Sequence, residues 1–194
     1  LNTLLLVLML VAPAARAADR SILVFGDSIS TALGIAQARG WVALLGERVK
    51  RERLDYSVVN ASLSGETTSG WAPRLPAALE RYRPAVVIIE HNASLDPRRC
   101  LVQPYDPDRR WDGSAFFGAS LGALRRLGAS RGYRLVAVEL TGTNAFLVRE
   151  DLAQPFAEAV APRAANYLLS GMTHPEPGEP AGYLDLEAGV PGPG

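Results

Sequence analysis

A serine that follows a short apolar run has the residue pattern most suggestive of catalysis. Ser28 lies in Gly26-Asp27-Ser28-Ile29-Ser30, directly after residues 21–26, whose apolar sequence is typical of a buried parallel strand. At the carboxyl end of such a strand, where open α/β sheets bind ligands, a tight turn at Gly26 exposes the hydroxyl. A serine hydroxyl is a weak nucleophile and needs a base within hydrogen-bond reach. The alternative is that Asp27 or Ser28 caps a following helix.

A second polar loop follows the next expected strand, residues 56–60. It reads Asn60-Ala61-Ser62-Leu63-Ser64-Gly65-Glu66-Thr67. Gly65 has no side chain to obstruct a substrate, and its backbone N–H is suited to bind a developing oxyanion. An ordinary turn glycine is the alternative.

The elements around these loops alternate between short apolar strands and amphipathic helices. This alternation predicts βαβ units and a parallel sheet. A long loop is expected at residues 91–113, which are rich in Pro, Asp and Arg, and only weak helix at 151–169. The expected strands are 21–26, 56–60, 85–90, 133–140 and 145–148, and the expected helices are 40–54, 71–82 and 114–131.

Composition limits the class of protein. The chain has 194 residues, of which 48% are hydrophobic, so it can form one α/β domain with a sizeable core. Lys and Arg together number 20, as do Asp and Glu, and this balance argues against a nucleic-acid partner. The single cysteine, Cys100, excludes an intrachain disulfide and a cysteine-only metal cluster.

Both ends of the chain differ in character from the rest. The apolar run at residues 4–11 ends at Pro13, well short of the roughly 20 residues that span a bilayer. Ala15-Arg16-Ala17 then fits a signal-peptidase site, so we expect a signal peptide at 1–17, export to the periplasm or medium, and no stable membrane span after its removal. A buried helix is the alternative. We expect a single α/β domain at 18–172 and a disordered tail, rich in Pro and Gly, at 173–194.

Together, these motifs resemble the SGNH, or GDSL-type, hydrolases, and in particular their bacterial periplasmic branch of thioesterases, lysophospholipases and arylesterases. The resemblance covers about residues 21–90. It implies a three-layer α/β/α sandwich with a mostly parallel sheet, a small acyl ester or thioester substrate, and no metal or organic cofactor. The residues that carry it are Gly26-Asp27-Ser28-Ile29-Ser30, Trp41, Val58-Val59-Asn60-Ala61-Ser62, Ser64-Gly65-Glu66-Thr67, Arg74-Leu75-Pro76 and Pro84.

The same resemblance assigns roles to residues. Ser28 is the expected nucleophile, with Asp27 in support, and the backbone amides of Ser28 and Gly65 are the expected oxyanion donors. The family's next donor is an Asn side chain after the third strand. Here Ser94 occupies that position, and Asn92, two residues earlier, is the candidate.

The family's last motif contains the catalytic base. His174-Pro175 matches its His-Pro pair, so His174 is the candidate base, although Gly171 stands where the family has an Asp. Loss of such a carboxylate lowers the rate roughly 10⁴-fold in analogous enzymes. The alternative is that His174 is a solvated loop residue.

The second half of the chain resembles the C-terminal part of SAM-dependent methyltransferase-like, or Rossmann, proteins instead. That resemblance implies that residues 133–148 form the closing pair of strands. Methyl transfer is not expected, because the chain contains no G-x-G-x-G run. The matching residues are Ile89-Glu90-His91-Asn92, Pro104-Tyr105-Asp106-Pro107, Trp111-Asp112-Gly113, Phe117-Gly118-Ala119-Ser120-Leu121, Gly132-Tyr133-Arg134-Leu135-Val136 and Thr143-Asn144-Ala145-Phe146-Leu147-Val148-Arg149.

Two interpretations of the whole chain follow. In one, it is an exported serine ester or thioester hydrolase, acting by acyl transfer through Ser28 with impaired activity. In the other, it is a catalytically inactive hydrolase-like or chimeric protein, in which a hydrolase half is fused near residues 87–91 to a methyltransferase-like half. A diverged SGNH protein without fusion is the more conventional form of the first.

Overall fold

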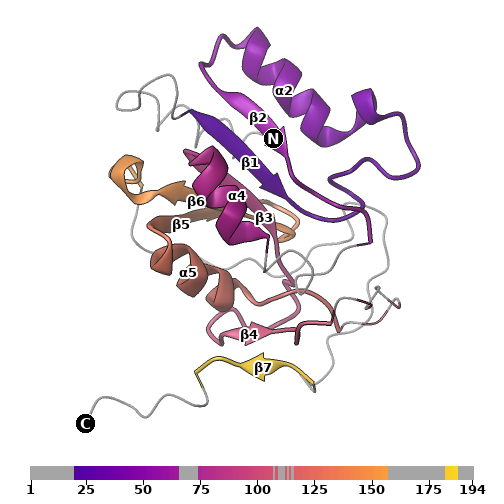
Figure 1. Cartoon of the computed structure of the whole chain (residues 1–194), viewed down its shortest axis with the longest axis vertical. Helices are drawn as coiled ribbons and strands as arrows, with labels where there is room; N and C mark the ends of the chain where they lie inside the picture. Colours follow the sequence, from indigo (N-terminus) through magenta and orange to yellow (C-terminus); the bar gives the residue numbers. More distant parts are fainter. Residues whose placement is uncertain are drawn as a thin grey trace.

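A five-stranded mixed sheet forms the centre of the protein (Figure 1). The computed structural model describes residues 20–65, 74–106, 108, 112, 114, 116–156 and 182–187. The sheet order is β2-β1-β3-β6-β5, and all its strands except β6 run in one direction. The fold is therefore α/β with a mostly parallel sheet, as the sequence predicts. The strands are β1 (Ser21–Phe25), β2 (Ser57–Asn60), β3 (Val86–Glu90), β5 (Tyr133–Val138) and β6 (Asn144–Arg149).

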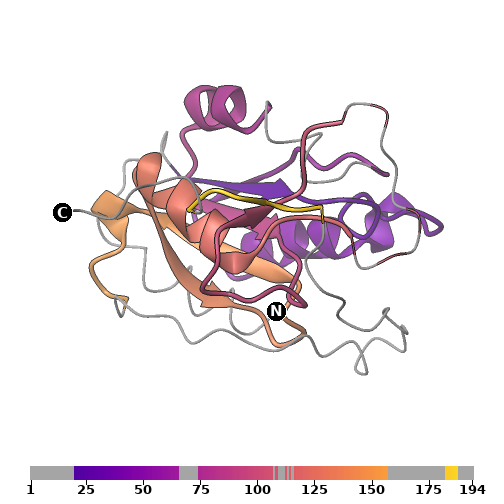
Figure 2. The ribbon, with the colours of Figure 1, turned by 90° about the horizontal axis from the view of Figure 1, so that it is seen from below.

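Helices cover both faces of this sheet and give it three layers (Figure 2). Helix α2 (Trp41–Arg51) packs on one face, and α4 (Leu75–Tyr82) and α5 (Leu121–Ser130) pack on the other. Strand β1 is buried along its whole length, because its side chains alternate between the two apolar layers. The three-residue 3₁₀ helices are η2 (Gln37–Arg39) and η3 (Glu150–Leu152).

The second half of the sheet is an antiparallel hairpin. The chain passes from β3 to the outer strand β5 and returns as β6, which lies between β3 and β5. Strand β6 runs against the other described strands of the main sheet, which agrees with the expected mostly parallel sheet. Only residues 139–143 separate β5 and β6, whereas a parallel connection needs a crossover of a dozen or more residues.

A second, two-stranded sheet lies below the main one in Figure 1. It pairs β4 (Leu101–Val102) with β7 (Leu184–Asp185) in antiparallel register. Residues 182–187, within the segment expected to form a disordered tail, are described by the structure and contain β7. The Tyr183 ring packs edge-on against Phe116 at 4.7 Å between ring centroids, and Arg99 forms a salt bridge to Asp185 at 2.8 Å.

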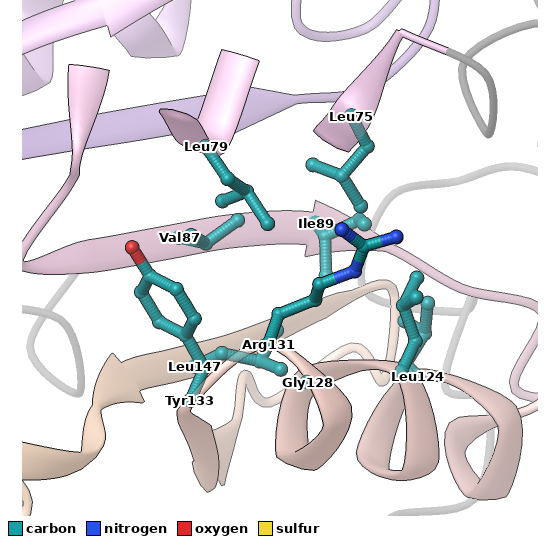
Figure 3. A pocket seen from close by; sticks show the side chains of 10 residues that line it. Leu75, Leu79, Val87, Ile89, Leu124, Gly128, Arg131, Tyr133 and Leu147 are labelled. Carbon is teal, nitrogen blue, oxygen red and sulfur yellow. The ribbon is translucent and has the colours of Figure 1, made fainter. Parts of the chain in front are cut away.

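The gap between α4 and α5 is small and lined mostly by aliphatic side chains (Figure 3). Its volume is about 20 Å³, close to that of one water-sized probe. This gap is a packing defect of the core rather than a site for a substrate. Leu75, Leu79, Val87, Ile89, Leu124 and Leu147 contribute to its lining.

Several expectations fall outside the described residues. They are the signal peptide at 1–17, most of the weak helix at 151–169, and the tail apart from 182–187. Within the described ranges, no helix combines the length and apolar character needed to cross a membrane.

Candidate active site

The carboxyl ends of β1, β2 and β3 meet at one edge of the sheet. Parallel register pairs Phe25 with Ile89 and Val24 with Asn60, so the residues that follow these strands are neighbours. The Ser28 turn (residues 26–33) therefore lies between the loop after β2 and the end of β3. This edge is where an open α/β sheet binds its ligands.

The Ser28 turn is held by its own hydrogen bonds. The Asp27 carboxylate accepts the N–H of Ile29 at 2.9 Å, and the carbonyl of Ser28 accepts the N–H of Leu33 at 3.0 Å. No helix follows directly, since η2 begins only at Gln37, so Asp27 stabilises a turn and not a helix start. Ser28 is partly exposed, and no described residue forms a hydrogen bond with its hydroxyl.

The Glu90 side chain fastens this turn to the end of β3. Its Oε2 accepts the N–H of Asp27 at 3.1 Å, and its Oε1 accepts the hydroxyl of Ser30 at 2.7 Å. Burial, reinforced by the negative charge of Asp27, raises the pKa of Glu90 to about 8. The Glu90 carboxyl group is therefore neutral at neutral pH, and it is hydrogen-bonded to the turn that carries the candidate nucleophile, Ser28.

Gly26 allows this close approach between the turn and β3. A Cβ at position 26 would lie 2.3 Å from Oε1 of Glu90 and 2.4 Å from Oγ of Ser30. Any side chain here would displace the Glu90 carboxyl group or the Ser30 hydroxyl, so the hydrogen bond between them requires a glycine at position 26.

The loop after β2 packs against the Ser28 turn. The N–H of Leu63 donates to the carbonyl of Gly26 at 3.3 Å, and the amide of Asn60 donates to the carbonyl of Ser30 at 2.8 Å. Gly65 has a φ of +75°, a left-handed conformation that favours glycine. The structure thus brings Ser28 and the loop that carries Gly65 to the same edge of the sheet.

His91 and Asn92 follow Glu90 but turn into the protein. His91 is buried, and its Nδ1 and its backbone N–H both lie within hydrogen-bond distance of the carbonyl of Thr143, at 3.1 and 2.9 Å. Because a carbonyl only accepts, Nδ1 carries the hydrogen. Burial lowers the pKa of His91 to about 4, so its imidazole is neutral at physiological pH.

The Asn92 amide is fully buried and already has partners. Its Nδ2 donates to the carbonyl of Phe117 at 2.9 Å and to the hydroxyl of Tyr183 at 3.3 Å, while its Oδ1 accepts the N–H of Ser94 at 2.9 Å. These contacts join the end of β3 to the segment that precedes α5 and to the one that contains β7.

Exposed apolar side chains occur in the segment that contains Ser28 and in the loop that packs against it. Four large aliphatic residues of the Ser28 turn, its continuation and the loop after β2 are exposed: Ile29 by 48%, Leu33 by 70%, Ile35 by 57% and Leu63 by 50%. An open groove of about 350 Å³ lies nearby, between the loop after β2 and α4. Asn60, Ser62, Arg74 and Arg81 contribute to its lining, and Ser28 does not.

The predicted site residues are thus only partly assembled in the described structure. Ser28, Asp27 and the Gly65 loop lie together, and Asn92 is bonded elsewhere. His174 and Gly171 lie outside the described residues. Sequence reasoning missed Glu90, although an acidic residue that ends an otherwise apolar strand was the available signal.

The comparisons with known proteins concern the same half of the chain. Residues 24–93 match the GDSL-like Lipase/Acylhydrolase family. This match includes Ser28, Gly65 and Glu90, and it ends one residue beyond Asn92. The resemblance to GDSL-type hydrolases is therefore confirmed for this segment.

Relatives match over a similar extent. Esterase TesA of Pseudomonas aeruginosa (strain PAO1) is 55% identical over 75 residues, which cover 39% of this chain and 37% of the relative. Thioesterase 1/protease 1/lysophospholipase L1 of Escherichia coli (strain K12) is 39% identical over 85 residues, 44% of this chain and 39% of the relative. A crystal structure of TesA is 54% identical over 36% of this chain and 39% of its own, with a TM-score of 0.35. This chain thus spans less than half the length of these proteins.

Proposed function

We propose that the chain is an exported serine hydrolase of GDSL type, which cleaves small acyl esters or thioesters through Ser28. The main support is that Ser28, in a turn at the carboxyl end of β1, lies beside the Gly65 loop within a segment that matches GDSL-like acylhydrolases. The hydroxyl oxygen attacks the acyl carbonyl as its proton passes to the base, and negative charge develops on the carbonyl oxygen. The bond to the alcohol or thiol then breaks, that group leaves with the proton, and water hydrolyses the acyl-enzyme to the free acid. The N–H groups of Ser28 and Gly65 are the candidate donors to that oxygen.

The substrate class is inferred from the side chains around Ser28. The exposed aliphatic side chains of Ile29, Leu33, Ile35 and Leu63 offer an apolar surface to an acyl chain. One of these relatives is named an esterase and another a thioesterase, which supports ester and thioester substrates alike. His174 is the proposed base, and export follows from the proposed signal peptide at 1–17.

The direct test is hydrolysis of p-nitrophenyl butyrate by the purified full chain. Ser28→Ala should lower kcat/KM by about 10³-fold or more, because the attacking atom is removed. Ser130→Ala is the matched control, since Ser130 is exposed at the end of α5 and should leave activity unchanged. Activity that persists in Ser28→Ala, or is absent from a correctly folded wild type, would contradict the proposal.

A catalytically inactive or chimeric protein is the second candidate, and three observations favour it. The Asn92 amide donates to Phe117 and Tyr183, so its use as an oxyanion donor would require these bonds to break. Loss of one such donor lowers the rate by about 10²–10³-fold. The family match also ends at residue 93, and the methyltransferase-like interpretation of the second half agrees with the hairpin of β5 and β6.

Covalent labelling separates the two candidates. A fluorophosphonate probe labels an activated serine, so labelling at Ser28 supports the hydrolase and its absence supports the inactive protein. Calorimetry with S-adenosylmethionine tests the second half separately. Measurable binding of S-adenosylmethionine would support a methyltransferase-like second half, and the missing glycine loop leads us to expect none.

A further inference from the structure

We infer that Glu90 is a positioning residue, whose carboxyl group holds the Ser28 turn against the end of β3 in the geometry that acyl transfer requires. The inference rests on the proposed function and adds to it a residue to which no role has been assigned. The hydrogen bonds of the Glu90 carboxyl group go to the turn and not to the Ser28 hydroxyl. Glu90 acts through the backbone of Asp27 and the side chain of Ser30, the residues on either side of Ser28–Ile29.

The geometry gives Glu90 two points of contact on the turn. The N–H of Asp27 and the hydroxyl of Ser30 reach the two oxygens of one carboxyl group, at 3.1 and 2.7 Å. Ser30 is itself buried, with 3% of its surface exposed, and its carbonyl accepts the amide of Asn60 from the end of β2. The turn is thus tied to the strands on both sides of β1.

Gly26 leaves room for the Glu90 carboxyl group to reach the turn. The register that pairs Phe25 with Ile89 places position 26 beside Glu90, and a Cβ there would lie 2.3 Å from the carboxyl oxygen. Because misplacement of a reacting atom by about 1 Å can lower a rate by 10²-fold, this contact has a kinetic consequence.

The two hydrogen bonds to the turn by themselves favour an ionised carboxylate, whereas burial and the negative charge of Asp27 outweigh them and keep the carboxyl group of Glu90 neutral. An ionised Glu90 would add a second negative charge beside Asp27 and would oppose the oxyanion that develops near Ser28. Asp27 is the charged group that faces Glu90 in the described structure. The residue paired with Glu90 on β6 is Asn144, β2 ends at Asn60, and His91 is neutral and turned toward Thr143.

Two substitutions separate positioning from a general loss of structure. In Glu90→Gln, the amide oxygen can accept the N–H of Asp27, and the NH₂ group can donate to the Ser30 oxygen, which reverses the direction of the wild-type hydrogen bond; the variant therefore keeps both contacts and cannot ionise. In Glu90→Ala, the Asp27 N–H and the Ser30 hydroxyl both lose their acceptor. With p-nitrophenyl acetate, Glu90→Ala should lower kcat by about 10²-fold, whereas Glu90→Gln should stay near the wild type below pH 7.

The pH profile is a readout that a purely structural role would not change. The ratio of wild-type kcat to Glu90→Gln kcat should fall as the pH rises through about 8, where the wild-type carboxyl ionises. Glu80→Ala, on the exposed side of α4, is the control and should keep the wild-type profile. An active wild type with a constant ratio between pH 6 and 9, or an active Glu90→Ala with unchanged kcat, would overturn the inference.

A readout independent of catalysis is the hydrogen exchange of the Asp27 amide. It should exchange about tenfold faster in Glu90→Ala and stay protected in Glu90→Gln, while the Ala61 amide, bonded to Val24, is unchanged. If the wild type hydrolyses no ester, the proposed function fails, and this exchange still decides whether Glu90 holds the turn. If Glu90→Ala does not fold, the pH dependence of the ratio of wild-type kcat to Glu90→Gln kcat decides whether Glu90 is a positioning residue.

Discussion

At the residue scale, the site depends on an unusual pair formed by a glycine and a carboxyl group. The side chain of Glu90 occupies the space beside the Cα of Gly26 that would otherwise hold a Cβ. Two polar groups, the Asp27 N–H and the Ser30 hydroxyl, gain an acceptor there. A side chain at position 26 would therefore both crowd the turn and disrupt these hydrogen bonds.

Gly26→Ala is expected to lower the free energy of unfolding by about 1–3 kcal/mol, the usual result of overpacking a filled site. The added methyl group lies too close to Oε1 of Glu90 and Oγ of Ser30 for either to stay in place. Urea unfolding followed by circular dichroism measures the change. The control is Gly46→Ala in α2, where an added Cβ would meet no atom within 4 Å. This substitution should raise the free energy of unfolding by about 0.5–1 kcal/mol, because alanine favours the helix more than glycine does. Equal effects of the two substitutions would contradict this account.

At the element scale, one serine joins helix α5 to the small sheet. The Ser120 hydroxyl accepts the N–H of Ala123 at 3.2 Å as the N-cap of α5, and it also accepts the N–H of Leu101 at the start of β4 at 3.0 Å. It donates to the carbonyl of Arg99 at 2.5 Å. The start of α5 is therefore fixed by a contact with a segment about 20 residues earlier.

Ser120→Ala should lower the free energy of unfolding by about 1–3 kcal/mol, since it removes a cap and leaves buried polar groups without a partner. Ser130→Ala, at the exposed C-terminal end of the same helix, is the control and should change it by less than about 0.5 kcal/mol. Thermal unfolding of the two variants beside the wild type makes the comparison. A Ser120→Ala variant as stable as Ser130→Ala would show that the three hydrogen bonds of Ser120 contribute little.

Local patterns in the sequence predicted some elements well. The expected strands 21–26, 56–60 and 85–90 differ from β1, β2 and β3 by at most one residue at either end, because each is a short apolar or β-branched run. The expected helix at 114–131 begins too early. Its apolar spacing includes Phe117, but the backbone of Phe117 instead bonds to the Tyr183 hydroxyl, 66 residues away in sequence.

At the scale of the whole molecule, the two halves differ in how far sequence alone could describe them. The first half matches a known family, and its turn and loop lie at the edge of the sheet where the resemblance places them. The role of Glu90 depends on the register between strands some 60 residues apart, which periodicity does not reveal. The same is true of β7, whose pairing with β4 joins segments more than 80 residues apart.

Two adjacent buried groups at the end of β3 should shape the pH dependence of stability for the whole domain. The folded-state pKa of Glu90 is raised from 4.5 to about 8, so the stability present below pH 4.5 declines as the pH rises toward 8. The folded-state pKa of His91 is lowered from 6.5 to about 4, so the stability present above pH 6.5 is lost as the pH falls toward 4. Between about 4.5 and 6.5 the two slopes oppose each other.

The free energy of unfolding should therefore be nearly constant between about pH 4.5 and 6.5, as far as these two groups determine it, and should fall on either side. Each limb has a slope of at most about 1.4 kcal/mol per pH unit, since one proton is involved. Urea titrations from pH 4 to 9 measure both limbs. Glu90→Gln should flatten the alkaline limb and leave stability rising with pH from about 4 to 6.5, because the His91 slope is then unopposed. His91→Gln should remove the acid limb and leave stability falling from about pH 4.5 to 8, because the Glu90 slope is then unopposed. An alkaline limb that survives unchanged in Glu90→Gln would show that another group titrates there and that Glu90 does not produce the limb.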